Sequence, residues 1–99
     1  MAGITLAAIL RVPPSGIADF QAYEDHVLPL LAEHGGTLER RLRNADGTVE
    51  VHILHFIAHE GYDAYRNDPR RRDAAPLMTA SGAATEAFEV TDVDMGDMA

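Results

Sequence analysis

The side chain that most clearly suggests chemistry is Glu24, a carboxylate within a helical pattern of apolar residues. On a helical wheel it falls beside Phe20, Val27 and Leu28, inside the stripe expected to face a core. A buried carboxylate is costly unless it is paired or protonated. We therefore expect Glu24 to have a defined partner, either as an acid-base catalyst or as a structural partner of Arg40, His55 or a tyrosine.

Two histidines, His52 and His55, lie in the alternating run TVEVHILHFIA at residues 48–58. Residues three apart on a strand point to opposite faces, so these two cannot bind the same metal ion. No other ligand falls at a recognisable spacing, and we expect neither a metal nor a cofactor. We expect His55 to share the helix-facing side with Arg40, which makes His55 the candidate for proton transfer and Arg40 a candidate for stabilising negative charge. His52 is expected to line the opposite face.

Aromatic residues are the candidates for ligand contact. Tyr23, Tyr62 and Tyr65, with Phe20, would suit a flat aromatic or other apolar molecule at the edge of a cleft. The simpler interpretation is that they are core aromatics whose hydroxyls reach a polar partner. The chain has no cysteine and no lysine, which excludes thiol nucleophiles, disulfides and Schiff-base chemistry.

Composition limits the partners. Ninety-nine residues are enough for one domain, and a formal charge of -8 argues against binding nucleic acid or an anionic membrane. The apolar opening MAGITLAAIL is interrupted by Arg11, well short of a membrane span, and we expect it to be a strand of a soluble, cytoplasmic protein.

Hydrophobic periodicity predicts six elements, at residues 4–12 (strand), 17–34 (helix), 37–43 (strand), 48–58 (strand), 59–80 (two helical segments) and 85–93 (strand). Pro29 is expected to kink the long helix, and Gly35 with Gly36 to end it. Asp46-Gly47 indicates a hairpin between the second and third strands. Residues 1–93 should form a single domain, followed by a mobile acidic tail at 94–99.

The order strand, helix, strand, strand, helix, strand is typical of an α+β, ferredoxin-like βαββαβ fold with a four-stranded antiparallel sheet. Right-handed crossovers place the first and third strands in the middle. Two helices would cover one face, and the other would still carry Ala7, Ile9, Leu54 and Phe56. We expect a second copy of the chain to cover that face, so that two sheets pack into a homodimer.

Two segments, FQAYEDHVLPLLAEHGGTLERR and VHILHFIAHEGYDAYRNDPRRRDAAPLM, carry a resemblance to a known group. The chain resembles the dimeric α+β barrel superfamily, close to its antibiotic-biosynthesis-monooxygenase-like domains and related small uncharacterised families. The resemblance implies a ligand cleft between the helices and the sheet of each subunit. The oxygenases of this group use a tryptophan in the second half, and this chain has none.

Two functions therefore stay open. The first is a cofactor-independent enzyme of the isomerase, cyclase or monooxygenase type, acting on a small apolar or aromatic metabolite, with Glu24, His55 and Arg40 as its catalytic residues. The alternative is a non-catalytic dimer that binds a small molecule or serves in an interaction. Ligand in the helix-sheet cleft would argue for a pocket, whereas a cleft filled by Phe20, Tyr23 and Leu31 would argue for a structural core.

Overall fold

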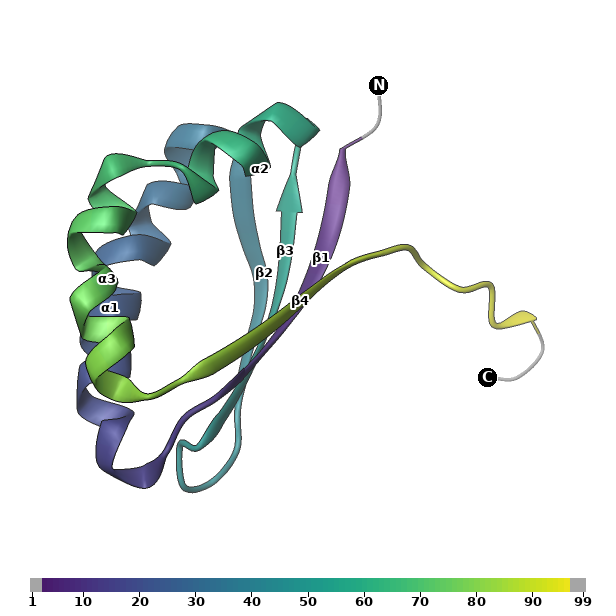
Figure 1. Ribbon diagram of the computed structural model, residues 1–99. Coiled ribbons are helices and arrows are strands. Elements are labelled where there is room, and N and C mark those ends of the chain that lie inside the picture. The colour runs from purple at the N-terminus through teal and green to yellow at the C-terminus, as the bar shows by residue number, and fades with distance from the viewer. Residues whose placement is uncertain (1–2, 97–99) are drawn as a thin grey trace.

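The computed structural model describes residues 3–96 and shows one antiparallel sheet with helices against one of its faces (Figure 1). The strand order is β2-β3-β1-β4. The elements in chain order are β1 (Ile4–Arg11), the 3-10 turn η1 (Pro14–Gly16), α1 (Ile17–Val27), the 3-10 segment η2 (Leu28–His34), β2 (Gly36–Arg43), β3 (Val49–Phe56), α2 (His59–Arg66), α3 (Pro69–Ser81) and β4 (Ala84–Val90). The ferredoxin-like α+β fold is thus confirmed, with β1 and β3 in the centre.

The predicted long helix is divided into two parts. α1 ends at Val27, and η2 continues as 3-10 helix to His34. Pro29 has no N–H to donate and its ring crowds the preceding turn, which favours the change from α-helix to 3-10 helix at this point. Gly35 then ends the segment with φ 72°, a left-handed conformation that glycine adopts without a steric penalty.

The third helical segment, α3, has a side-chain cap at its start and a glycine after its end. The Asp68 side chain accepts a hydrogen bond from the Arg70 backbone N–H, with Pro69 at the first helical position. α3 continues through Pro76 and ends at Gly82, which has φ 71°. Asp68 also lies 2.8 Å from His34 Nε2, which ties the start of α3 to the end of η2.

The core lies between the helices and the sheet. Phe20 from α1 and Phe56 from β3 are completely buried, and Val27 is almost so. Phe20 packs with residues of β1, whereas Phe56 packs with the end of η2 and with α2. The predicted apolar stripe of the first helix is confirmed, including the burial of Glu24 within it.

The prediction of which sheet face meets the helices is wrong for β3. Glu50, His52 and Phe56 face the helices and are buried, whereas Val51 and Ile53 lie on the other side. Apolar periodicity predicts that the face of β3 with the β-branched residues Val51 and Ile53 packs in the core. In this chain the polar side is buried instead, because its charged groups pair with one another.

The face turned away from the helices is apolar and uncovered within residues 3–96; we call it the open sheet face. Its apolar members are Ala7, Ile9, Leu42, Val51, Ile53, Phe88 and Val90. Phe88 is 50% exposed, and all seven residues of the edge strand β4 are exposed. Leu54 and Phe56, expected on this face, lie on the helix side instead.

The segment after β4 runs away from the body of the domain (Figure 1). Of the tail that we expected to be mobile, residues 97–99 lie outside the described residues. Among residues 3–96, none of the helices has both the length and the apolar character needed to cross a bilayer.

Candidate functional site

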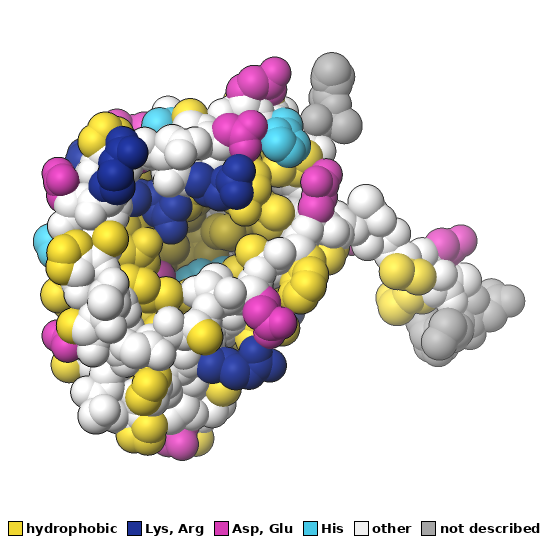
Figure 2. Space-filling view, in the orientation of Figure 1, with side chains coloured by type: hydrophobic (Ala, Val, Ile, Leu, Met, Phe, Trp, Pro, Cys, Tyr) yellow, Lys and Arg dark blue, Asp and Glu magenta, His cyan; other side chains and the backbone are white. Residues whose placement is uncertain are grey.

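A cleft of about 230 Å³ lies between the helices and the sheet. Figure 2 shows this hollow, with hydrophobic side chains on its walls, histidine surface deep inside and basic side chains gathered at its rim. Its lining includes residues from α1, β3, α2, α3 and the edge strand β4: Tyr23, Glu24, Val27, His52, Leu54, Tyr62, Tyr65, Arg66, Arg71, Met78, Thr85 and Ala87. A second, shallower groove of about 360 Å³, lined by His26, Leu30, Arg70, Asp73, Ala74 and Leu77, contains none of the acid-base residues described below.

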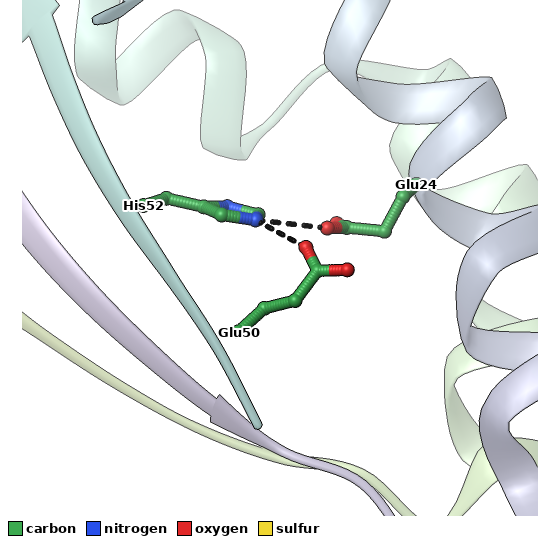
Figure 3. Close-up of side chains that lie close together, drawn as sticks. All are labelled: Glu24, Glu50 and His52. Atoms are coloured by element: carbon green, nitrogen blue, oxygen red, sulfur yellow. Dashed lines mark hydrogen bonds and ion pairs between the residues drawn. The ribbon is translucent and has the colours of Figure 1, made fainter. Parts of the chain in front are cut away.

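Glu24 and His52 meet at this cleft from opposite layers of the fold (Figure 3). α1 presents Glu24 and β3 presents His52, and each residue is only 3% exposed. Glu24 Oε1 lies 3.1 Å from His52 Nε2. Among the described residues this buried oxygen has no hydrogen-bond partner of good geometry, because His52 Nε2 bonds Glu50 Oε1 at 2.8 Å instead. The Glu24 oxygen therefore lies close to the imidazole without forming a well-aligned hydrogen bond to it.

Glu50 lies at the centre of a buried charge cluster that also contains Glu24, His52, Arg41 and Arg43. It is completely buried, and it accepts hydrogen bonds from Arg41 Nε at 3.0 Å and Arg43 Nε at 2.7 Å. The three residues come from the β2–β3 hairpin, where Arg43 lies directly opposite Glu50 and Arg41 directly opposite His52. The two guanidinium groups compensate the buried charge of Glu50. Arg41 also extends toward Glu24, with Nη2 3.8 Å from Oε1.

The cluster shifts the pKa values of its members in opposite directions. Burial raises the pKa of Glu50, but hydrogen bonds from His52, Arg41 and Arg43 outweigh it and lower the pKa to about 2. Burial lowers the pKa of His52, but its interactions with Glu24 and Glu50 outweigh it and raise the pKa above the ordinary value. Glu50 is thus a permanent carboxylate that stabilises a proton on His52.

Glu24, Glu50 and His52 also have the spacing of metal ligands, with one donor atom from each lying within 4.8 Å of the others. The positive charge in the cluster is supplied by Arg41 and Arg43, which occupy both oxygens of Glu50. A further cation would have to compete with two guanidinium groups for the same carboxylate. We interpret the arrangement as a network of ion pairs and assign no metal to it.

Three tyrosines and two arginines also line the cleft. Arg66 stacks over the Tyr62 ring at 4.7 Å from its centroid, and Arg71 over the Tyr65 ring at 4.6 Å. Arg71 Nη2 donates to the Tyr23 hydroxyl at 3.1 Å. The Tyr65 hydroxyl donates to the Val27 carbonyl at 3.2 Å, and burial raises the pKa of Tyr65 to about 12.

Of the four residues expected to contact a ligand, the structure brings three together. Tyr23, Tyr62 and Tyr65 all line the cleft. Phe20 does not: it is completely buried and packs with Ala8, Leu10 and Val12. Its place at the centre of the apolar stripe made it a core residue, and the cleft begins one turn further along α1.

The expected positions of His55 and Arg40 are wrong. His55 faces away from the helices, with Nδ1 3.3 Å from the Thr5 hydroxyl, and Arg40 is exposed opposite Ile53. Arg40 and Leu42 pair with Ile53 and Val51 on the open sheet face. A bulge between Leu38 and Arg40 returns Leu38 to the helix side.

His52, which we expected to face away from the helices, lies on the helix side together with Glu50. Their spacing of two on a strand puts both side chains on one face. Together with two arginines on the neighbouring strand, this makes a charge-balanced group that can be buried. Arg71 was missed because it lies in the run RRR at residues 70–72, which is typical of a solvated helix surface.

Known proteins share this fold at low sequence identity. Neither a protein-family model nor a curated protein matches the sequence. The structure is similar to SnoaB, a cofactor-independent oxygenase from Streptomyces nogalater, with a TM-score of 0.75, 18% identity, and coverage of 95% of this chain and 96% of that one. A Caulobacter crescentus protein, provisionally named an antibiotic biosynthesis monooxygenase, has a TM-score of 0.72, 13% identity and coverage of 92% of both chains.

A third similar structure is a Nipsnap-family protein of unknown function from Agrobacterium tumefaciens. Its TM-score is 0.65, with 15% identity and coverage of 94% of this chain and 92% of that one. The resemblance to antibiotic-biosynthesis-monooxygenase-like, ferredoxin-fold proteins is thus confirmed over most of the chain. At these identities the similarity establishes the fold, and the reaction has to be argued from the site.

Proposed function

We propose that this protein is a cofactor-independent enzyme that binds a small apolar or aromatic metabolite in the helix-sheet cleft and removes or relocates one of its protons. Glu24 is the group that accepts the proton, and His52 is the acid-base partner beside it. The reaction class that fits is proton abstraction next to a carbonyl, leading to isomerisation or cyclisation.

One observation carries this proposal. Glu24 Oε1 is buried at the cleft, forms no hydrogen bond of good geometry with the described residues, and lies 3.1 Å from His52 Nε2. A purely structural carboxylate is normally satisfied by donors, as Glu50 is in the same cluster. An oxygen left free at a ligand-sized opening is available to a substrate proton.

Exchange of an acidic C–H bond tests this without knowledge of the natural substrate. In D₂O, 2-indanone should exchange its α-protons for deuterium faster with the protein than without it, as followed by proton NMR. Glu24→Gln should abolish this acceleration, because an amide cannot accept the proton. Glu39→Gln, which changes an exposed carboxylate on β2, is the matched control and should retain it. Acceleration that survives Glu24→Gln would contradict the proposal.

Oxygenation is the second candidate, supported by the likeness to SnoaB, which is named a cofactor-independent oxygenase. Removing a proton from an enolisable ring gives an electron-rich anion, the form in which an organic molecule can react with O₂ directly. Consumption of O₂ by the protein and an enolisable substrate would favour this outcome over isomerisation. The absence of tryptophan distinguishes this chain from the oxygenase pattern.

We further propose that the working form is a homodimer located in the cytoplasm. The open sheet face supports the dimer, because apolar residues of four strands are uncovered there and exposing them to water is unfavourable by roughly 25 cal/mol per Å². A non-catalytic, ligand-binding dimer would pair through the same open sheet face. The exchange experiment separates that alternative from the enzyme.

A further inference from the structure

Arg71 is the unusual cation of this chain. It lines the cleft and is partly buried, and its side chain makes contacts with the Tyr23 hydroxyl, the Tyr65 ring and, at 3.5 Å, the Arg66 carbonyl. Its Nε is buried without a hydrogen-bond acceptor among residues 3–96. No carboxylate in that part of the chain forms an ion pair with it.

The other arginines show how unusual this is. Five of them have carboxylate partners: Arg11, Arg41, Arg43, Arg66 and Arg70. Of those without such a pair in the described range, Arg40 and Arg72 are exposed, where water solvates the charge. Arg71 alone is partly buried without a counterion, in a protein whose sixteen acidic residues far outnumber its eight basic ones.

Burying a guanidinium without an anion is unfavourable, and an unmade hydrogen bond from a buried N–H adds to the cost. Tyrosine contacts offset part of this cost, since Arg71 stacks on the Tyr65 ring and donates a hydrogen bond to the Tyr23 hydroxyl. Neither contact supplies a negative charge. A ligand with a carboxylate would supply it, because the planar guanidinium matches a carboxylate with two parallel hydrogen bonds.

The volume of the cleft limits how large the ligand can be apart from its carboxylate. A volume of about 230 Å³ lies below the roughly 300–1,000 Å³ typical of sites for drug-sized molecules. Arg71 and Glu24 line the cleft together with the apolar side chains of Val27, Leu54 and Met78. These apolar side chains suit an apolar body about the size of one ring.

We infer that the cleft binds a small monocarboxylate with a single-ring apolar body, whose carboxylate pairs with Arg71 and whose far end faces Glu24. This inference deepens the proposed function and rests on it for the role of the far end. The orientation follows from charge: the ligand's anion stays beside the guanidinium, away from the two carboxylates of the cluster. The far end of a substrate would then present its acidic C–H or O–H group to Glu24.

The experiment compares two probes of nearly equal shape, cyclohexanecarboxylate and the neutral cyclohexanecarboxamide. Both are transparent where tyrosine absorbs. The chain has three tyrosines and no tryptophan, and all three tyrosines line the cleft, so intrinsic fluorescence reports on this site directly. We expect the carboxylate to bind at least about tenfold more tightly than the amide at low ionic strength. Equal binding of the two probes by the parent protein would overturn the inference.

Two variants locate the effect. Arg71→Gln should remove the preference for the carboxylate. Arg72→Gln, the matched control, changes the neighbouring exposed arginine, whose side chain donates a hydrogen bond to the Asn67 carbonyl. It should leave the preference intact. Equal loss in both variants would show a general effect of charge and would overturn the assignment to Arg71.

If Arg71→Gln does not fold, Tyr23→Phe provides the second test. It frees Arg71 Nη2 and should preserve or strengthen carboxylate binding. Loss of the preference in that variant would overturn the inference.

Failure of this inference can be distinguished from failure of the proposed function. Glu24→Gln leaves Arg71 untouched, so carboxylate preference should persist while proton exchange is lost. Preference without Glu24-dependent exchange would support the anion site and contradict the enzyme. Exchange of a neutral ketone without carboxylate preference would support the enzyme and contradict the anion site.

Discussion

Glu24 Oε1 and His52 Nε2 lie 3.1 Å apart, although one residue comes from helix α1 and the other from the central strand β3. The contact crosses the interface between the two layers of the fold, at the point where the cleft reaches the sheet. Glu50 Oε1 lies 2.8 Å from the same histidine nitrogen, so both carboxylates approach the imidazole at Nε2 (Figure 3). The imidazole is therefore hydrogen-bonded to one fully paired carboxylate, Glu50, and lies within ion-pair distance of a second, Glu24.

Substitution of Glu24 separates catalysis from structure. Glu24→Gln keeps the shape of the side chain and replaces an oxygen that makes no hydrogen bond of good geometry. We expect its free energy of unfolding to stay within about 1 kcal/mol of the parent. Its proton-exchange rate should fall by roughly a hundredfold or more, since general-base catalysis typically contributes that much. Urea unfolding and deuterium exchange measure the two effects.

A structural role for Glu24 would give the opposite result. Breaking a buried ion pair costs about 3–5 kcal/mol, so Glu24→Gln would then be strongly destabilised while the folded fraction kept its activity. If Glu24→Gln changes neither the free energy of unfolding nor the rate of proton exchange, the Glu24 carboxylate matters for neither stability nor catalysis.

The protonation of His52 provides a second prediction. Its pKa is raised because Glu24 and Glu50 stabilise the imidazolium more than burial disfavours it. We expect Glu24→Gln to lower the His52 pKa, because one of the two negative neighbours is lost. NMR titration of the histidine ring protons measures this. Glu39→Gln, far from the imidazole on the exposed side of β2, should leave the titration unchanged; an identical shift in both variants would refute a local interaction.

Much of the architecture could be predicted from the sequence because local signals agree with it. Pro29, Gly35 and Gly82 interrupt or end helices for reasons of backbone geometry that need no tertiary context. The alternation in β1 and the Asp46-Gly47 turn fix the strands and one hairpin. The chain order then leaves few topologies.

The side of the sheet that carries the site could not be predicted in the same way. Periodicity identifies two faces of β3 but ranks them by hydrophobicity, and Val51 and Ile53 are more apolar than Glu50 and His52. Burial of the polar face depends on charges from Arg41 and Glu24, which belong to other elements. The pairing of Arg41 and Arg43 with His52 and Glu50 follows from the hairpin register, whereas the approach of Glu24 from α1 becomes visible only when the elements are placed in space.

The Glu50 cluster predicts how stability depends on acidity. The pKa of Glu50 is lowered from 4.5 to about 2, so its ion pairs stabilise the fold fully above about pH 4.5. That contribution should be lost as the pH falls from 4.5 toward 2, because the folded state must then bind a proton that the unfolded state already holds. Urea midpoints between pH 6 and pH 2 measure it.

Arg43→Gln should weaken this dependence on pH, because it removes a donor from Glu50. Arg11→Gln is the matched control: it breaks the pair with Glu86, in which both side chains are more than half exposed. Exposed pairs contribute little, so its acid profile should follow the parent. Equal flattening in both variants would mean that the buried cluster is not the source.

The open sheet face gives the last prediction, which concerns assembly. Ile53 lies on β3 in the centre of the sheet, and Phe88, on the edge strand, is 50% exposed on the same face. If two copies pack through this face, Ile53→Asp combined with Phe88→Asp should convert a dimer into a monomer, because each copy would bury two unpaired carboxylates at the interface. Sedimentation velocity at micromolar concentration distinguishes the two states. Ala75→Asp, which adds charge to an exposed position on α3, is the control and should remain dimeric. A parent protein that sediments as a monomer, or a double variant that stays dimeric, would show that this face does not join two copies.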